Sequence, residues 1–246
     1  MDAPESRDED SGQALQMKGL GSVETQVRNA ITRAIIDRRL PPGTRLIENQ
    51  LAQVFGISRM RMRKVLHSLG HTPFVTLEPH RGAFVARPKS EEARQIFEAR
   101  RVLEEGIVRL LAERGSEADF EVLKRHIEAE ERARHDGDTV LAVRLAGEFH
   151  IVMAQATGNP ILSEQLGGLI DRTRFIISVF GREGSHGCPA HTHIVDCLER
   201  RDANAAAERM RVHFEEIEAS LDLDLQGEKP IDFRRVFFQE HGRQID

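Results

Sequence analysis

The chain has few cysteines and no long apolar run. Cys188 and Cys197 are the only cysteines among its 246 residues, and they form neither a Cys-x-x-Cys pair nor a disulfide framework. No apolar run approaches the roughly 20 residues of a membrane-spanning helix. The first 17 residues are acidic and polar, unlike a secretory signal. We therefore expect a soluble, cytoplasmic protein that does not contact a membrane, with residues 1–17 forming a disordered tail.

The chain also lacks an even distribution of charge. Its net charge is −5, but residues 18–90 hold thirteen Lys and Arg against four Asp and Glu, whereas residues 91–246 hold twenty-one against thirty-one. A polyanion such as DNA would bind only the first of these segments. The length is sufficient for two domains that each bury a core, and the change in charge indicates where the first one ends.

Residues 18–87 are predicted to begin with two helices that are separated by a short strand. Apolar residues recur at helical spacing after Ser22, which is a good N-cap, and this pattern stops at a Leu-Pro-Pro-Gly segment. A strand is expected at residues 45–47. The next helix is expected at residues 48–55, where apolar residues again share one face.

A short turn joins this helix to a third one, which makes a helix-turn-helix. Gly56 can end the preceding helix, and Ser58 can cap the next, which continues to about Leu69. Residues 74–77 and 83–86 are rich in β-forming residues and flank a Pro-His-Arg-Gly turn, so they predict a hairpin with a basic tip. The segment therefore has the pattern of a winged helix-turn-helix domain.

The third helix is expected to read DNA. The N-terminal residues of such a helix reach base edges in the major groove, and an arginine fork can bond both acceptors of guanine or clamp a phosphate. These arginines could instead form only an exposed helix face, but the turn, the wing and the positive charge together favour DNA. The predicted DNA-binding residues are Arg45, Ser58, Arg59, Arg61, Arg63, Lys64, Arg81 and Gly82.

The segments PPGTRLIENQLAQVFGISRMRMRKVLHSL and PHRGAFVA resemble the DNA-binding half of the GntR family of bacterial transcriptional regulators. The family usually has a sequence like SRTPVREAL where this chain has SRMRMRKVL. Arg59 and Arg63 match the two arginines of the family pattern, whereas Met60, Arg61 and Lys64 depart from it. The resemblance implies an operator as partner, and the departures leave the operator sequence open.

Residues 91–225 are predicted to form an all-helical domain, after a linker at residues 88–90 and before a C-terminal tail at residues 226–246. Only helical periodicity follows the linker. The expected helices are 91–114, 117–135, 138–157, 160–180, 190–201 and 203–222. The fold class is therefore mainly α, with the winged domain first. Docking of the tail is suggested by Phe233, Val236, Phe237 and Phe238.

The segments RRVLEEGIVRLLAER, EFHIVMAQATGNPIL and HTHIVDCLERRDANAAAERMRVHF resemble the FCD ligand-binding domain of the FadR-like subgroup. No His-Glu-x-x-His pair is present, and a lone helical histidine is usually structural. The resemblance nevertheless implies that His150, His191 and His213 converge and hold a divalent transition metal, for which three imidazoles suit Zn. Relatives that bind metal usually carry an Asp where this chain has Ala146.

Arg100 is the predicted effector-binding residue. It lies on the apolar face of its helix, where an unpaired guanidinium would be costly. It therefore needs an anion, either Glu104 or Glu148 in a structural salt bridge or the carboxylate of an effector.

The sequence thus predicts a homodimeric regulator, not an enzyme, that binds a double-stranded DNA operator and responds to a small organic acid near a metal. The alternatives are a metal-dependent hydrolase that uses the three histidines and a regulator for which the metal itself is the signal.

Overall fold

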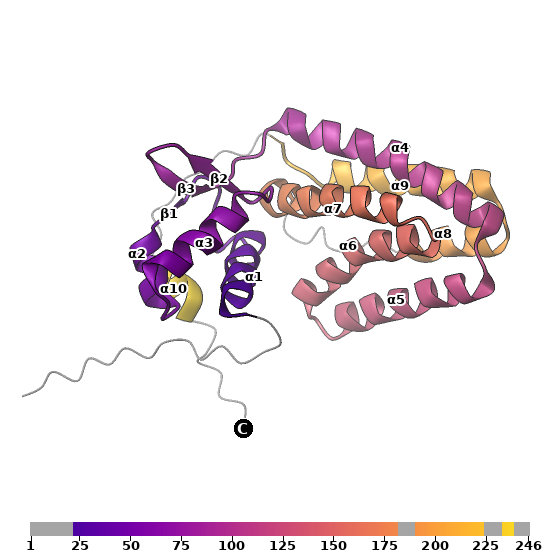
Figure 1. Cartoon of the computed structure of the whole chain (residues 1–246). Coiled ribbons are helices and arrows are strands. Elements are labelled where there is room, and N and C mark those ends of the chain that lie inside the picture. The colour runs from indigo at the N-terminus through magenta and orange to yellow at the C-terminus, as the bar shows by residue number, and fades with distance from the viewer. Residues whose placement is uncertain (1–21, 182–189, 224–232, 239–246) are drawn as a thin grey trace, which may run out of the picture.

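The computed structural model describes residues 22–181, 190–223 and 233–238. A small winged unit lies beside a bundle of long helices (Figure 1). In chain order the elements are α1 (Val23–Ile36), β1 (Arg45–Leu46), α2 (Glu48–Val54), α3 (Arg59–Leu69), β2 (Val75–Glu78), β3 (Gly82–Val85), α4 (Ser90–Arg114), α5 (Glu117–His135), α6 (Thr139–Ala156), α7 (Pro160–Phe180), α8 (Ala190–Glu199), α9 (Ala203–Ala219) and α10 (Phe233–Phe238).

The winged unit combines three helices with an antiparallel sheet of order β1-β3-β2. Ser22 caps α1 by accepting a hydrogen bond from the backbone N–H of Thr25, as the sequence predicts. Gly56 adopts a φ of +62° between α2 and α3, a conformation that favours glycine. The apolar faces of α1, α2 and α3 close over one face of the sheet and bury residues such as Ile31, Leu51 and Leu66.

The helices expected at 117–135 and 160–180 have these bounds in the structure, and other expected elements have ends that differ by one to three residues. The wing strands are each displaced by one residue, to Val75–Glu78 and Gly82–Val85, and β1 ends at Leu46. The last two long helices end at Glu199 and Ala219, before the expected 201 and 222. Side-chain caps and frayed last turns set such ends, and periodicity does not resolve them.

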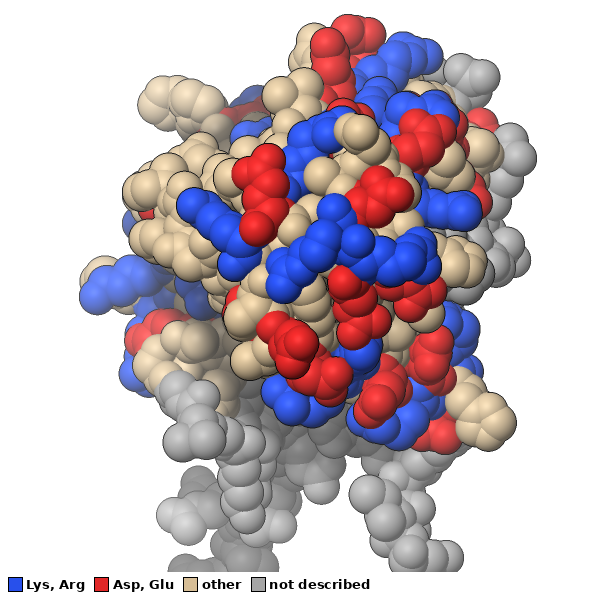
Figure 2. Space-filling model, turned by 90° about the vertical axis from the view of Figure 1, so that its right-hand side faces the viewer, with Lys and Arg blue, Asp and Glu red and all other residues tan. Residues whose placement is uncertain are grey.

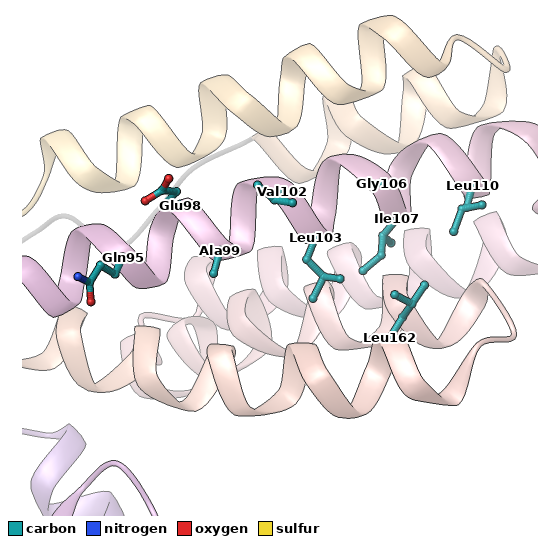
Figure 3. A pocket seen from close by; sticks show the side chains of 9 residues that line it. All are labelled: Gln95, Glu98, Ala99, Val102, Leu103, Gly106, Ile107, Leu110 and Leu162. Carbon is teal, nitrogen blue, oxygen red and sulfur yellow. The ribbon is translucent and has the colours of Figure 1, made fainter.

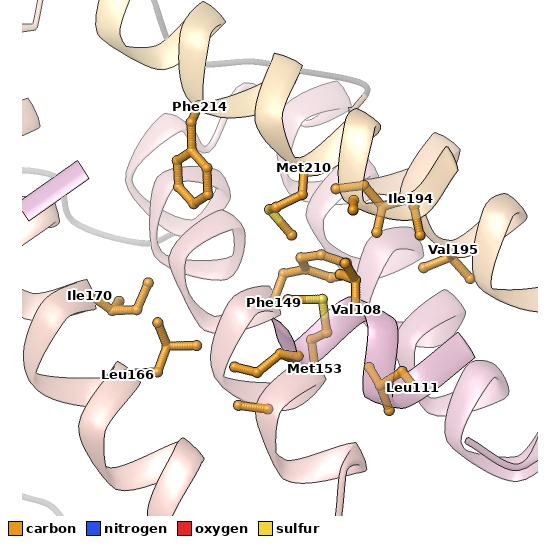
Figure 4. Packing of buried hydrophobic residues seen from close by; sticks show 14 of the residues in the cluster. Val108, Leu111, Phe149, Met153, Leu166, Ile170, Ile194, Val195, Met210 and Phe214 are labelled. Atoms are coloured by element: carbon orange, nitrogen blue, oxygen red, sulfur yellow. The ribbon is translucent and has the colours of Figure 1, made fainter. Parts of the chain in front are cut away.

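The long helices form the second unit around a continuous apolar core. Helix α4 packs along α9 and α7, while α5 packs against α6 and α8. Phe149 and Met153 of α6 lie in the middle of this core, surrounded by side chains from the neighbouring helices (Figure 4). A capping box between Ser116 and Asp119 starts α5, so the chain can reverse direction in a short connection.

Two sets of contacts join the units. Phe175 of α7 packs edge-on against Phe74 of the winged unit, with ring centroids 5.6 Å apart. Arg38, which follows α1, donates hydrogen bonds to the carbonyl oxygens of Ile177, at 3.3 Å, and Gly181. The C-terminal half of α7 is therefore the main contact of the helical bundle with the winged unit.

Helix α10 returns from the end of the bundle and packs on the winged unit. The ring of Phe237 meets that of Phe55 at 4.8 Å, and Phe233 and Phe237 are both buried in the winged core. Arg39 donates a hydrogen bond of 2.9 Å to the carbonyl oxygen of Val236. The structure thus places the aromatic part of the C-terminal tail against α2. The side chain of Phe238 is outside the described residues.

The far end of the helical bundle carries both signs of charge. Lysine and arginine side chains alternate there with aspartate and glutamate (Figure 2), and Lys124 pairs with Glu121 and Glu199. Among the helices that the structure describes, none combines the length and apolar composition of a membrane-spanning segment. Cys197 is a buried free thiol, while Cys188 and the expected tail at 1–17 lie outside the described residues.

Candidate functional site

Helix α3 presents a cationic surface at its N-terminal end. Ser58 occupies the N-cap and accepts a hydrogen bond of 3.3 Å from the backbone N–H of Arg61. The side chains of Arg59, Arg61 and Arg63 are between 50% and 67% exposed, and Lys64 is also exposed. Met62, Val65, Leu66 and Leu69 face the core instead. The helical period therefore separates the buried anchoring face of α3 from an exposed cationic face.

These arginines are paired with carboxylates of the same unit. Arg61 Nε lies 2.8 Å from Glu24 of α1. Arg63 forms a bidentate pair with Glu48 of α2, with nitrogen–oxygen distances of 3.1 Å, and Arg59 Nε lies 4.0 Å from the same carboxylate. A backbone hydrogen bond holds the pKa of Glu24 below its usual value, and the hydrogen bond from Arg61 lowers it further. Sequence reasoning missed these pairs because the partners are 37 and 15 residues apart.

The wing supplies a second basic point. Arg81 lies at the tip of the β2–β3 hairpin, is 70% exposed, and pairs with Glu78. Gly82 has a φ of +102° with open space around it, so backbone conformation and not crowding requires glycine there. Arg45 of β1 is exposed and lies opposite Phe84 of the wing. Arg45 on β1 and Arg81 at the hairpin tip therefore add positive charge to the sheet, which packs beside α3.

In the helical bundle, His150, His191 and His213 converge from α6, α8 and α9. All three are buried, and one nitrogen of each lies within 4.8 Å of the others. The Nε2 atoms of His150 and His213 are 3.3 Å apart. His191 Nε2 and His213 Nδ1 are buried without a hydrogen-bond partner among the described residues. Buried nitrogens without partners are unfavourable unless a further group completes them.

Two buried carboxylates orient two of these rings. Glu104 accepts a hydrogen bond from Nδ1 of His150, and Glu130 accepts one of 2.9 Å from Nδ1 of His191. The guanidinium of Arg100 and the ring of His150 hold the pKa of Glu104 down at about 2 against the effect of burial, so this carboxylate is ionised and only accepts. Nδ1 of His150 therefore carries the proton, and its Nε2 lone pair faces the other histidines.

The histidine cluster fits a divalent metal ion. Burial lowers the pKa of His150 to about 4 and lowers that of His213 as well, so both rings are neutral at physiological pH, as metal ligands must be. Carboxylates that fix the other nitrogen of a ligating histidine are the usual support of such sites. Glu104 accepts hydrogen bonds from both Arg100 and His150, so it supports the His150 ring and is not itself a ligand.

Arg100 forms the structural salt bridge that the sequence allows. It is 1% exposed, and its Nε donates a hydrogen bond of 2.7 Å to Glu104, while its guanidinium lies 4.8 Å from the centre of the Phe214 ring. Glu148 pairs with Arg144 instead. Arg100 Nη2 remains buried without a partner among the described residues. The salt bridge therefore satisfies only some of the N–H donors of the Arg100 guanidinium.

A cavity of about 110 Å³ opens onto the histidines and Arg100. Ala146 lines it, four residues before His150 on the same face of α6. Arg134 of α5 and Arg174 of α7 also line it, and sequence reasoning missed both. The only local signal for Arg134 is its i,i+4 spacing from Glu130, which is typical of a salt bridge on one helix face. The rest of α5 has an ordinary amphipathic pattern, which does not indicate a binding site.

Two protein families match this chain in consecutive segments. Residues 24–85 match "Bacterial regulatory proteins, gntR family", and residues 95–216 match "FCD domain". The two matches cover the winged unit and the helical bundle that carries the histidines. Members of these families are transcriptional regulators, which confirms the expectation of a regulator and not an enzyme.

Curated relatives and solved structures agree with this assignment. The transcriptional regulator YdhC of Bacillus subtilis is 25% identical over 77% of this chain and 86% of its own length. The repressor RspR of Escherichia coli is 22% identical over 84% of this chain and 92% of its own length. The fold resembles that of a GntR regulator from Rhodococcus sp. RHA1, with a TM-score of 0.69 at 23% identity over 81% of this chain and 97% of that one. The chain is therefore a DNA-binding transcriptional regulator of the GntR family, with an N-terminal winged helix-turn-helix and a C-terminal FCD domain.

Proposed function

We propose that this regulator is a homodimer whose operator affinity changes when a small organic acid binds beside a divalent metal ion in the FCD domain. The observation that carries the proposal is the cavity that the three histidines share with Arg100. His191, His213 and Arg100 each have a buried polar atom without a partner among the described residues. Helix α7 lines this cavity and also contacts the winged unit. A ligand in the cavity therefore touches the element that joins the two units.

At the operator, the N-terminal half of α3 lies in the major groove. Arg59, Arg61, Arg63 and Lys64 contact base edges and phosphates, and Ser58 with its neighbouring backbone N–H groups meets a phosphate. The carboxylates of Glu24 and Glu48 release their arginines when DNA binds. Arg45 and Arg81 contact the flanking backbone, and Gly82 allows the wing to turn.

The DNA contacts are tested by replacing Arg59 and Arg63 together with alanine. The probe is duplex DNA that the wild-type protein selects from a random pool, and affinity is measured over a series of salt concentrations. If each arginine of a dimer releases one counterion, the slope of log affinity against log salt falls by about 3 to 4. The double variant Arg125→Ala and Arg132→Ala has the same charge change on exposed positions of α5 and should keep the wild-type slope. Equal slopes for all three proteins would refute the assignment.

His150, His191 and His213 hold the metal, and Zn is the ion that three neutral imidazoles suit best. When bound, the ion supplies positive charge and open positions for a ligand carboxylate. Metal content is measured after reconstitution of the full chain with Zn. His191→Ala should lower the bound metal, whereas His193→Ala, an exposed neighbour on α8, should not. Equal metal content in both variants would contradict the site.

The effector acts through α7. Thr173, Arg174 and Ile177 line the cavity, while Phe175 packs on Phe74 and the carbonyl of Ile177 accepts from Arg38. A ligand that binds one placement of α7 better than another shifts the position of the winged units and hence the affinity for the operator. To produce such a shift, the ligand must bind one placement of α7 more tightly than the other by a few kcal/mol.

This coupling is tested by measuring operator affinity for the Zn-loaded protein with and without a panel of organic acids, and again after chelation. An acid that changes affinity only in the Zn-loaded protein supports the proposal. A change on chelation that no acid alters would indicate that the metal is itself the signal. No change in either case would overturn ligand control and leave the DNA contacts intact.

A groove on α4 and α7 is the proposed dimer surface. Ala99, Val102 and Gly106 line its exposed side (Figure 3), and the groove measures about 570 Å³. Val102 is 76% exposed, Ile161 of α7 is 60% exposed, and a Cβ at Gly106 would meet open space. An apolar stripe at helical spacing favours a second helix as its cover, and a two-fold dimer matches two operator half-sites.

The double variant Val102→Glu and Gly106→Glu should sediment as a monomer at concentrations where the wild type is a dimer. The double variant Val122→Glu and Glu121→Gln changes exposed positions of α5 and should remain dimeric. A wild type that is monomeric at operator-binding concentrations would refute the dimer, and a dimeric Val102→Glu, Gly106→Glu variant would refute this surface.

A further inference from the structure

The FCD cavity is lined by more positive charge than a single carboxylate needs. Arg100 from α4, Arg134 from α5 and Arg174 from α7 all reach it, and Glu130 is the only carboxylate that the described lining contains. Glu104, behind the lining, pairs with Arg100. Glu130 is already shared between Arg134 and His191. Positive charge that is largely buried is stable only when an anion compensates it.

Each of the three guanidinium groups has a buried N–H group without an acceptor among the described residues. These are Nη2 of Arg100, Nε of Arg134 and Nε of Arg174. Arg174 has the weakest partner, because its Nη1 lies 4.0 Å from an oxygen of Asp171, whose side chain is 51% exposed. Its own side chain is only 25% exposed. Arg174 is therefore a cation that faces the cavity with little compensation from the protein.

Arg174 is separated from the histidines by about one turn of α6. Its Cδ would lie 3.5 Å from a Cβ at Gly147, which is three residues before His150. Three residues of α-helix correspond to a rise of about 4.5 Å. Gly147 and Val143 both line the cavity. The cavity thus has a histidine end, which includes Arg100 and, through Glu130, Arg134, and a second cationic end at Arg174.

We infer that the effector carries two acid groups, and that the second one binds Arg174. This inference rests on the proposed function, since the first acid group is the one assigned to the metal and Arg100. The ligand class is a short-chain dicarboxylic acid.

The placement of Arg174 also connects the second acid group to the winged unit. The next residue of α7, Phe175, is the one that packs on Phe74. A carboxylate that draws Arg174 towards the cavity constrains the backbone at this contact. A monocarboxylate bound only at the histidine end does not reach it. Dicarboxylates are therefore the ligands that change operator affinity.

The test is calorimetric titration of the full chain, both Zn-loaded and metal-stripped, with malonate, succinate, glutarate and adipate and with butyrate and valerate as single-acid controls. Wild type should bind its best dicarboxylate at least about tenfold more tightly than either monocarboxylate, the factor expected for one charge-assisted hydrogen bond. Arg174→Gln should abolish this preference and leave monocarboxylate affinity within about twofold. Arg172→Gln, an exposed position on the same helix, should behave as wild type.

The outcomes separate this inference from the proposed function. Equal binding of mono- and dicarboxylates to the wild type would overturn the second acid group and leave the first intact. Loss of both ligand classes in Arg174→Gln, with an unchanged melting temperature, would show that Arg174 does not act on the second acid group, and would overturn the inference. Absence of binding of any acid to the wild type would overturn both.

Discussion

Replacing Glu104 by glutamine should destabilise the metal-free protein by about 3 kcal/mol. The side chain of Glu104 is 0% exposed and accepts hydrogen bonds from the guanidinium of Arg100 and from Nδ1 of His150. Its pKa is lowered from 4.5 to about 2, and at 1.36 kcal/mol per unit the ionised form is favoured in the fold by about 3 kcal/mol. Because a lowered pKa stabilises the fold at every pH above the ordinary carboxyl value, the full difference is expected at pH 7. Removing one partner of a buried ion pair costs a similar amount, about 3 to 5 kcal/mol.

The same substitution has a second consequence at the histidines. A glutamine offers one acceptor oxygen and one NH₂ group, so it cannot accept from both Arg100 and His150. If its NH₂ group donates to Nδ1 of His150, the ring proton moves to Nε2 and the lone pair that faces the other histidines is lost. Zn affinity should therefore fall by about 10- to 100-fold, the usual effect of losing a supporting carboxylate.

The stability difference is measured by urea unfolding of chelator-treated full-length protein at pH 7, followed by circular dichroism at one protomer concentration. Glu113→Gln is the matched control, since Glu113 is exposed on the same helix. It should unfold within about 0.5 kcal/mol of wild type. A Glu104→Gln variant that also unfolds within 1 kcal/mol of wild type, with unchanged Zn affinity, would refute both the buried ion pair and the tautomer argument.

Three further predictions follow from single residues. Ser58→Ala removes the cap of α3 and should lower stability by about 1 kcal/mol in urea unfolding, whereas Ser58→Gly should cost only a few tenths; equal losses would argue against the cap. Phe237→Ala should destabilise the winged unit by about 3 kcal/mol, because the ring is buried against Phe55; calorimetry should show a lower first transition, and an unchanged profile would mean that α10 does not pack there in solution. Ala146→Asp places a carboxylate four residues before His150 on the cavity side and should tighten Zn binding in competition with a chelator, while weaker binding would show that the cavity rejects a fourth protein ligand.

Much of the winged unit was determined by the sequence alone, because its signals are local. Ser22 and Ser58 cap helices through side-chain oxygens three residues from the bonded N–H groups, and Gly56 ends α2 through its own backbone freedom. The apolar period of α3 also fixes which of its arginines face outward. These features depend on residues within a few positions of one another, so they can be predicted without knowledge of the tertiary contacts.

The tertiary structure alone decided the partners of those residues. The pairing of Arg61 with Glu24, of His191 with Glu130 and the approach of Arg174 to Gly147 each join helices that are distant in the chain. Hydrophobic periodicity predicts which face of a helix is buried. It does not predict which helix packs on that face, or how the two helices are aligned along their axes. The histidine cluster was expected only from resemblance, and its supporting carboxylates and second cationic end appear only when α4, α5, α6 and α7 pack around one cavity, because burial and long-range packing set those contacts.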